Sequence, residues 1–295
     1  MTTTRSSRLM MITAMVIYGT IGLFRRMIPL DSSMIAMLRG ITGGLFLLLV
    51  MLLRRQKPDL AAIKREKWKL ILSGAVMGFN WILLFESYRF TSVAVSTLCY
   101  YMAPVFVTLA APFLFRERLT PVRCLGIGLS LVGMVLVSGV TDAGLQASEL
   151  KGVLLGLGAA VLYATVVLLN KSLGPVPAMD KTIVQLLSAG IVLLPYTLLA
   201  GAWPAAAPDG KSLALLAVVC ILHTGLAYLL YFGSMDGLSA QTIALLGYID
   251  PVVAVLLSAL VLGEALTPAG ILGAVLILLG TAAGELLPAR GRRTE

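Results

Sequence analysis

The sequence predicts an all-α membrane protein of ten transmembrane helices, arranged as two inverted five-helix repeats. Three observations support this fold class: the apolar composition, the recurrence of long apolar runs, and an internal repeat. Of the 295 residues, 59% are hydrophobic and 13% are charged, whereas soluble domains are about half apolar and about a quarter charged. A spanning helix needs about 20 apolar residues, so the recurring runs indicate many crossings rather than one anchor.

Ten apolar runs have a suitable length, and each predicts one helix. In chain order they cover residues 9–24, 33–53, 68–88, 92–115, 121–140, 152–170, 182–201, 213–233, 239–262 and 268–287. The first run follows a basic segment, as the apolar part of a signal peptide does. No small-residue cleavage site follows it, and Arg25 and Arg26 come next. We therefore expect a retained first helix.

Basic residues predict the orientation of these helices. If the N-terminus is cytoplasmic, 17 lysines and arginines fall in cytoplasmic segments and five fall outside. The positive-inside rule then places both termini in the cytoplasm, with the chain crossing the inner membrane. The net charge of +9 is a topology signal in this interpretation, so we expect the lipid bilayer and no nucleic acid as a partner.

The ten runs consist of five that occur twice. Residues 92–133 match residues 239–280 at a shift of 147 positions. The matched pairs include Ser92 with Ser239, Tyr101 with Tyr248, Pro104 with Pro251, and the two E-x-L-T-P elements that end at Pro121 and Pro268. An odd number of spans in each copy turns the second copy over in the membrane. The sequence thus predicts two units, residues 1–145 and residues 146–295.

These paired proline elements, with the glycine-rich helices that follow them, resemble EamA-type members of the drug/metabolite transporter superfamily. The resemblance covers nearly the whole chain. It implies a ten-helix transporter of small metabolites. It also implies that the first, third and fourth helices of each repeat line a central cavity. It does not define a substrate, because the family handles amino acids, sugars, nucleotide derivatives, amines and drugs.

Polar and aromatic residues near the middle of those six spans are the candidate substrate-binding residues. They are Tyr18, Asn80, Trp81, Tyr101, Tyr163, His223, Tyr228, Tyr248 and Asp250. Inverted repeats place a substrate site near the bilayer centre, which is the depth these residues share. The alternative is that the tyrosines only fill gaps between helices.

Asp250 is the strongest of these candidates. A carboxylate at the centre of a spanning helix costs about 2.5–3.5 kcal/mol, so we expect it to face the interior. Pro251 cannot donate a hydrogen bond one turn back, which frees the carbonyl of Gly247 beside the carboxylate. We expect Asp250 to meet a substrate ammonium or to carry a coupled proton. The alternative is a hydrogen bond to a tyrosine or to His223 that only fixes helix packing.

The predicted gate or coupling residues are Asp250, His223, Glu86 and Arg39. His223 is the only histidine and is predicted at the depth of Asp250, which suggests a proton relay. Arg39 and Glu86 are predicted to form a salt bridge in the outer part of the second and third helices, or an outer gate that separates when the site opens. Arg39 and Arg89 are the only cations that could meet a carboxylate, and both are predicted at the periphery.

These features favour a secondary transporter, an exporter of amino acids or related amino compounds that works by alternating access and proton coupling. Uptake or exchange of amines, quaternary ammonium compounds or drugs is the alternative. The chain has no G-x-x-x-x-G-K-[ST] loop for ATP. Only one aspartate lies at the midplane, so an intramembrane enzyme is a remote alternative, and we expect no cofactor or metal. The glycine-rich helices at 121–140 and 268–287 suggest a homodimer face.

Overall fold

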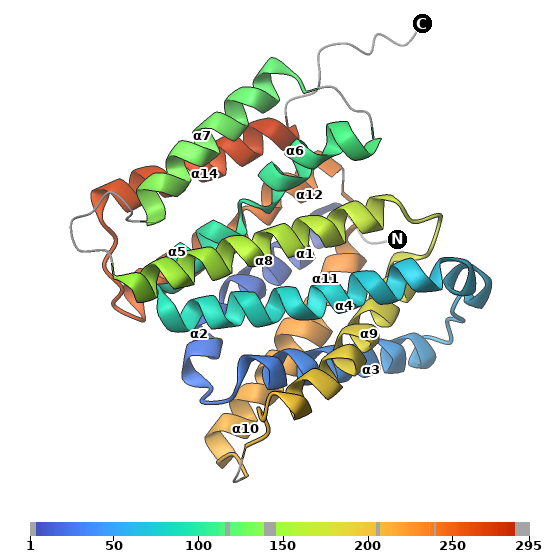
Figure 1. Ribbon diagram of the computed structural model, residues 1–295. Coiled ribbons are helices and arrows are strands. Elements are labelled where there is room, and N and C mark those ends of the chain that lie inside the picture. Colours follow the sequence, from blue (N-terminus) through green and yellow to red (C-terminus); the bar gives the residue numbers. More distant parts are fainter. Residues whose placement is uncertain are drawn as a thin grey trace, which may run out of the picture.

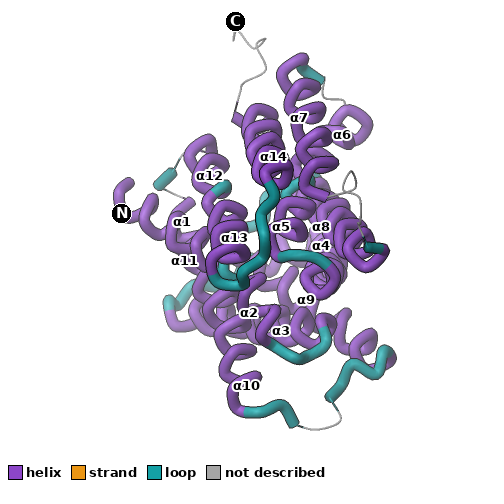
Figure 2. The backbone as a smooth tube through the Cα atoms, turned by 90° about the vertical axis from the view of Figure 1, so that its left-hand side faces the viewer, coloured by secondary structure: helices purple, strands orange, loops and turns teal. Residues whose placement is uncertain are grey.

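The structure is a computed structural model that describes residues 4–115, 119–138, 146–204, 207–235, 237–238 and 240–286. The described residues form helices, turns and loops without any strand (Figure 1 and Figure 2). The predicted all-α class is therefore confirmed.

The first half of the chain contains seven helices within the described residues. They are α1 (Thr4–Gly19), α2 (Ile21–Met27), α3 (Ser32–Leu53), α4 (Leu60–Phe90), α5 (Val93–Tyr100), α6 (Ala103–Phe115) and α7 (Pro121–Ser138). The second half contains α8 (Ala147–Lys171), α9 (Ala178–Leu199), α10 (Gly210–Ala217), the π-helix η1 (Val218–Leu226), α11 (Ala227–Met235), α12 (Ala240–Gly247), α13 (Ile249–Leu260) and α14 (Pro268–Leu286).

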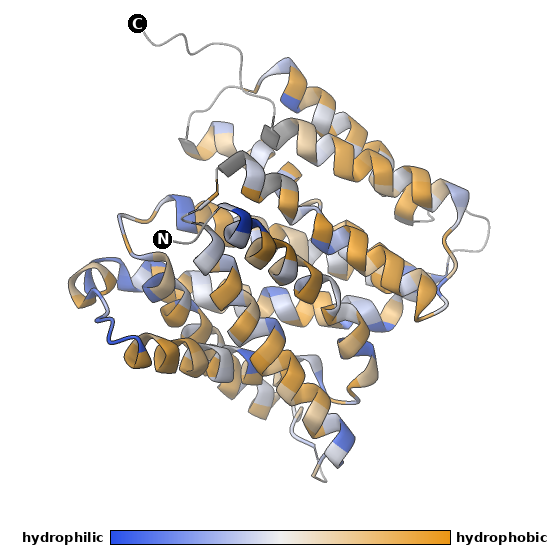
Figure 3. Cartoon of the chain, turned by 180° about the vertical axis from the view of Figure 1, so that it is seen from behind, coloured by the Kyte–Doolittle hydropathy of each residue, from blue (hydrophilic) through white to orange (hydrophobic). Residues whose placement is uncertain are grey.

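Many of these helices can cross a membrane. Among the described residues, seven segments are long and apolar enough: Thr4–Met27, Ser32–Leu53, Leu60–Phe90, Val93–Leu114, Ala147–Lys171, Ala178–Leu199 and Gly210–Ser234. Shorter apolar helices at Pro121–Val137, Ile249–Leu260 and Pro268–Ala283 lie in the other three predicted spans. Hydrophobic residues cover most of the helix length (Figure 3). The chain is a multi-pass membrane protein, and the count of ten crossings stays a prediction.

The main helix contacts follow a pseudo-two-fold pattern. α4 packs against α8, and the corresponding helices α11 and α1 pack against each other. α4 packs against α9 as η1 packs against α3, and α13 packs against α1 as α5 and α6 pack against α8. Two of the remaining main pairs join equivalent helices, α3 with α9 and α7 with α14 (Figure 1). α5 also packs against α13, which joins the equivalent predicted spans at 92–115 and 239–262. This packing agrees with two structural copies in one chain.

Two predicted spans break at equivalent positions. α5 ends at Tyr100 and α6 begins at Ala103, while α12 ends at Gly247 and α13 begins at Ile249. Pro104 and Pro251 lie in the first turn of the helix after each break. A proline there has no N–H to donate to the preceding turn, so the chain leaves helical geometry just before it. Both breaks lie beside the space between the two halves.

The glycine-rich faces of α7 and α14 pack on each other. A Cβ atom on Gly133 would lie 2.6 Å from the carbonyl oxygen of Gly273, and one on Gly280 would lie 2.5 Å from that of Gly126. Glycine at these positions lets the two backbones touch. The predicted homodimer through these helices stays a prediction, and it would use their other faces.

We predict that Gly133→Ala destabilises the protein, because the added Cβ atom meets backbone that cannot move away. Overpacking of this kind costs about 1–3 kcal/mol. Gly128→Ala on the same helix is the matched control, since a Cβ there has nothing within 4 Å. Thermal unfolding of both variants in detergent should show a lower midpoint for Gly133→Ala alone. Equal midpoints would contradict this account of the α7–α14 contact.

Candidate functional site

A cavity of about 390 Å³ lies between the two halves of the chain. α1, α4, α5, α6, α8, α11, α12 and α13 contribute to its wall, as do the start of α2 and one residue of α3. Its polar and aromatic lining consists of Tyr18, Arg39, Trp81, Phe85, Tyr88, Thr97, Tyr100, Tyr101, Tyr163, Tyr228, Tyr231, Tyr248 and Asp250. Methionine and other apolar side chains complete the wall.

The structure brings together most of the predicted binding residues. Seven of them line the cavity: Tyr18, Trp81, Tyr101, Tyr163, Tyr228, Tyr248 and Asp250. Asn80 and His223 are not among the lining residues that the structure describes. All six spans that the family resemblance implied contribute, and the second span adds Arg39. The sequence-based set did not include Tyr88 or Tyr231 as binding residues, although both lie on those spans.

The tyrosines contact one another across helices. Tyr18 on α1 meets Tyr228 on α11 edge to face, with ring centroids 5.7 Å apart. Tyr163 on α8 lies 5.3 Å from Tyr100 on α5. Pairs at such distances stabilise packing by about 0.5–1.5 kcal/mol beyond area burial. The rings therefore act as packed walls and also offer π faces to the cavity.

Asp250 lies at the α12–α13 break. The Tyr101 hydroxyl donates to Oδ2 of Asp250 at 3.0 Å and lies 3.3 Å from the carbonyl oxygen of Gly247. Gly247 is the residue one turn before Pro251, whose carbonyl a proline frees. One hydroxyl proton is thus shared between the carboxylate and the freed carbonyl. The carboxylate also lines the cavity, so the tyrosine contact holds Asp250 at the cavity wall.

Arg39 does not pair with Glu86, so the predicted Arg39–Glu86 salt bridge is wrong. Glu86 lies 3.1 Å from Arg89 and accepts a hydrogen bond of 2.5 Å from Ser32. Ser32 begins α3, whereas Arg39 is seven residues further along, which is about 10 Å along a helix.

The Arg39 side chain is instead part of the cavity wall. It is only 4% exposed, and its Nε donates to the Thr224 hydroxyl at 2.9 Å. Its guanidinium carbon lies 4.3 Å from the centre of the Trp81 ring. The expectation that Arg39 is peripheral is therefore also wrong.

His223 lies in the π-helix η1 and packs against the junction of α1 and α2. Its Nε2 lies 2.8 Å from the hydroxyl of Thr20, and its ring lies 4.9 Å from the Phe24 ring. The Thr20 hydroxyl also lies 2.7 Å from the Ile17 carbonyl oxygen, and His223 Nδ1 lies 3.3 Å from the carbonyl oxygen of Val218. The tautomer of the imidazole decides which of its two nitrogens donates. The π-helical turn cannot be read from the apolar periodicity of the sequence.

Asn80 joins two helices behind the cavity wall. Its side-chain amide donates to the carbonyl oxygen of Ala159 at 2.5 Å, and the Tyr100 hydroxyl lies 3.4 Å from its Oδ1. The residue is fully buried. A hydrogen bond of this kind satisfies polar groups that hydrocarbon cannot.

A polar cluster ties helix ends together on the side away from the N-terminus. Arg26 donates to Glu264 at 2.7 Å, and the backbone N–H of Val93 donates to the same carboxylate at 2.8 Å. Ser258 also donates to Glu264 and accepts from the backbone N–H of Ala94 at 3.3 Å. We call these five residues the Glu264 cluster.

The Glu264 cluster joins the ends of α2, α5 and α13, and α13 also packs against α5. A carboxylate at the start of α5 is favoured because helix N-terminal N–H groups attract negative charge. The cavity wall, in contrast, continues toward the N-terminal side as far as Met11, Tyr231 and Ile243. The sequence offers one signal for the cluster. Glu264 lies in the loop at 263–267, which corresponds to the basic loop at 116–120 in the first repeat.

Known proteins share this architecture. The EamA-like transporter family matches the chain twice, over residues 5–139 and 150–283. The uncharacterized transporter YxxF of Bacillus subtilis (strain 168) is 31% identical over 280 residues, which cover 92% of this chain and 87% of that protein. The uncharacterized transporter YoaV of the same organism is 24% identical over 246 residues, which cover 82% of this chain and 83% of that protein. A solved crystal structure shares the fold with a TM-score of 0.65 at 22% identity, over 96% of this chain and 97% of that one.

We predict that Glu264→Ala loosens the helix ends joined by the Glu264 cluster. The reporter is Ala94→Cys, a position that is 1% exposed, in a background where the exposed Cys124 is changed to serine. A maleimide should modify this cysteine slowly in the parent protein and faster after Glu264→Ala, because the carboxylate no longer holds the start of α5. Glu149→Ala, on the exposed first turn of α8, is the control. An unchanged rate in Glu264→Ala would show that the cluster does not hold this side closed.

Proposed function

The chain belongs to the EamA-like transporter family, and on this premise we propose that it is a secondary transporter that exports amino acids or related amino compounds. The observation that carries the proposal is the aromatic cavity between the two halves, with Asp250 in its wall. Aromatic faces attract cations and cover apolar bodies, and a carboxylate accepts hydrogen bonds from an ammonium group. This chemistry suits a small molecule with a positively charged amine.

The packing of the helix ends supports alternating access. Inverted repeats move one half against the other around a site near the bilayer centre. The Glu264 cluster holds one side together, while the cavity wall continues toward the other side. Exchange between this arrangement and its opposite would expose the site to each side in turn.

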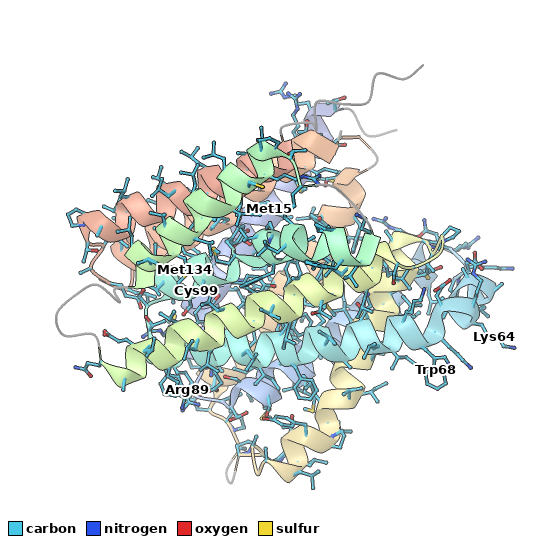
Figure 4. All side chains as sticks on the ribbon, turned by 45° about the horizontal axis from the view of Figure 1, so that its top comes forward. Met15, Lys64, Trp68, Arg89, Cys99 and Met134 are labelled. Atoms are coloured by element: carbon cyan, nitrogen blue, oxygen red, sulfur yellow. The ribbon has the colours of Figure 1, made fainter. Side chains whose placement is uncertain are left out.

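The distribution of basic residues supports an orientation with both termini in the cytoplasm of a cell with an inner membrane. Lys64 lies near one end of α4 and Arg89 near the other (Figure 4). The end near Lys64 carries Lys64, Arg65, Lys67 and Lys69, which favours the cytoplasmic side. The Glu264 cluster would then close the outer side, and the structure would represent an inward-facing state.

Asp250 is the residue we assign to proton coupling. A proton and a substrate ammonium would compete for the same carboxylate, which links binding of one to release of the other. The Tyr101 hydroxyl, which donates to Asp250, would hold this side chain at the cavity wall whether a proton or a substrate ammonium is bound. His223 is separated from this role by its packing against Thr20 and Phe24, so the proposal needs no direct relay between the two residues.

We predict that Asp250→Asn inserts and folds but loses pH-driven accumulation of substrate in liposomes, falling to the level of empty liposomes. Exchange of substrate across the membrane should weaken as well, because the neutral amide resembles the protonated acid, which does not carry the charge that binds the substrate ammonium. Asp180→Asn is the matched control, since Asp180 is a buried acid that binds the backbone N–H of Asp59 outside the cavity. Full pH-dependent accumulation by Asp250→Asn would refute the coupling role.

We also predict the orientation directly. In the Cys124→Ser background, Ala202→Cys should react with an impermeant maleimide from outside intact cells, and Gln56→Cys should react only after the cells are opened. The reason is the excess of basic residues on the side of Gln56. The reverse pattern of labelling would overturn the orientation and, with it, the inward-facing interpretation.

A further inference from the structure

The guanidinium group of Arg39 has hydrogen-bond donors to spare. A guanidinium carries five N–H donors. In the described part of the chain, Nε donates to Thr224, and neither Nη1 nor Nη2 has a hydrogen-bond or ion-pair partner in the protein. The Arg39 side chain is only 4% exposed, yet it lines the cavity. The two Nη groups are thus the part of this side chain that is left for a ligand.

The surroundings hold the guanidinium in one orientation. Trp81 lies 4.3 Å and Phe85 lies 5.4 Å from its central carbon, which fixes the guanidinium against aromatic faces. The Thr224 hydroxyl accepts from Nε at 2.9 Å and donates to the carbonyl oxygen of Val219 at 3.2 Å, within the π-helix. Aromatic faces attract the charge but do not replace the hydrogen bonds of the N–H groups.

A buried arginine without an acidic partner is costly in a membrane protein. Charged residues at membrane depth usually pair with one another or mark the path of a ligand. Asp250 is the acid that lines the cavity, and the described residues contain no ion pair between it and Arg39. The cavity therefore offers a separate positive site and a separate negative site.

We propose that Arg39 is an anion subsite that binds the carboxylate of the substrate through Nη1 and Nη2. Arginine is suited to this because its planar fork donates two parallel hydrogen bonds to a carboxylate. The inference rests on the proposed function and narrows it to zwitterions, with the carboxylate at Arg39 and an ammonium at Asp250. Amines and quaternary ammonium compounds without a carboxylate would leave Arg39 unpaired. A compound with several negative charges would face repulsion from Asp250.

The test compares each amino acid with its primary amide, which keeps the ammonium and the shape but lacks the negative carboxylate. Leucine with leucinamide and phenylalanine with phenylalaninamide are two such pairs, measured as competitors of transport by the protein in liposomes. The wild-type protein should prefer the acid by at least about 30-fold, since loss of one partner of a buried charge pair costs about 2 kcal/mol or more. Arg39→Gln should reduce that preference to about one.

Two further variants separate recognition from folding. Arg39→Lys keeps the charge but not the two-pronged geometry, so its preference should fall between those of the wild type and Arg39→Gln. Arg25→Gln removes an equally buried arginine outside this cavity, and its preference should equal that of the wild type. If Arg39→Gln does not fold, the wild type and Arg39→Lys still give the comparison.

Three outcomes would count against the two proposals in different ways. Transport by the wild type without preference for the acid would refute the anion subsite and leave the proposed function standing. An unchanged preference in Arg39→Gln or Arg39→Lys would do the same. Failure of the wild type to transport any amino compound would refute the proposed function itself.

Discussion

The lack of water in the hydrocarbon core of a membrane decides where each polar group of this chain can lie. An unsatisfied backbone or side-chain group costs several kcal/mol there, which favours polar groups that are paired inside the protein or face a cavity. The carbonyl that Pro251 frees at Gly247 is met by Tyr101, and Asn80 is met by the carbonyl of Ala159. The Arg39 donors that have no partner among the described residues belong to a side chain that lines the central cavity. The same constraint that shapes the packing thus locates the site.

The two halves share a backbone plan but not its charges. Pro104 and Pro251 occupy equivalent places after equivalent helix breaks, yet Ala103 precedes the first and Asp250 precedes the second. The main helix contacts repeat in pairs across the chain. In the proposed mechanism, a symmetric scaffold of this kind would close on either side with similar packing, while Asp250 gives the cavity a negative site. The symmetric backbone would then provide the movement, and the asymmetric charges would provide the recognition.

The sequence predicted the helices, and the polar residues that line the cavity, better than the partners of those residues. Apolar runs predict which residues form long helices, and Pro251 predicts the free carbonyl beside Asp250. Neither pattern determines how one helix is rotated against another. The sequence therefore predicts an Arg39–Glu86 pair, although Ser32 is the residue of α3 that reaches Glu86. The π-helix that carries His223 and Thr224 leaves no mark in the apolar pattern. The Glu264 cluster depends on contacts between helix ends far apart in sequence, which no local pattern contains.

We propose that the cavity binds a zwitterion between the positive Arg39 and the negative Asp250. A cryo-electron microscopy structure with a bound amino acid, chosen as the one that most raises the thermal stability of the protein, would test this binding mode. We expect the substrate carboxylate within hydrogen-bond distance of the Arg39 Nη groups and the substrate ammonium at Asp250. A substrate bound with its carboxylate away from Arg39, or outside the cavity, would refute this binding mode.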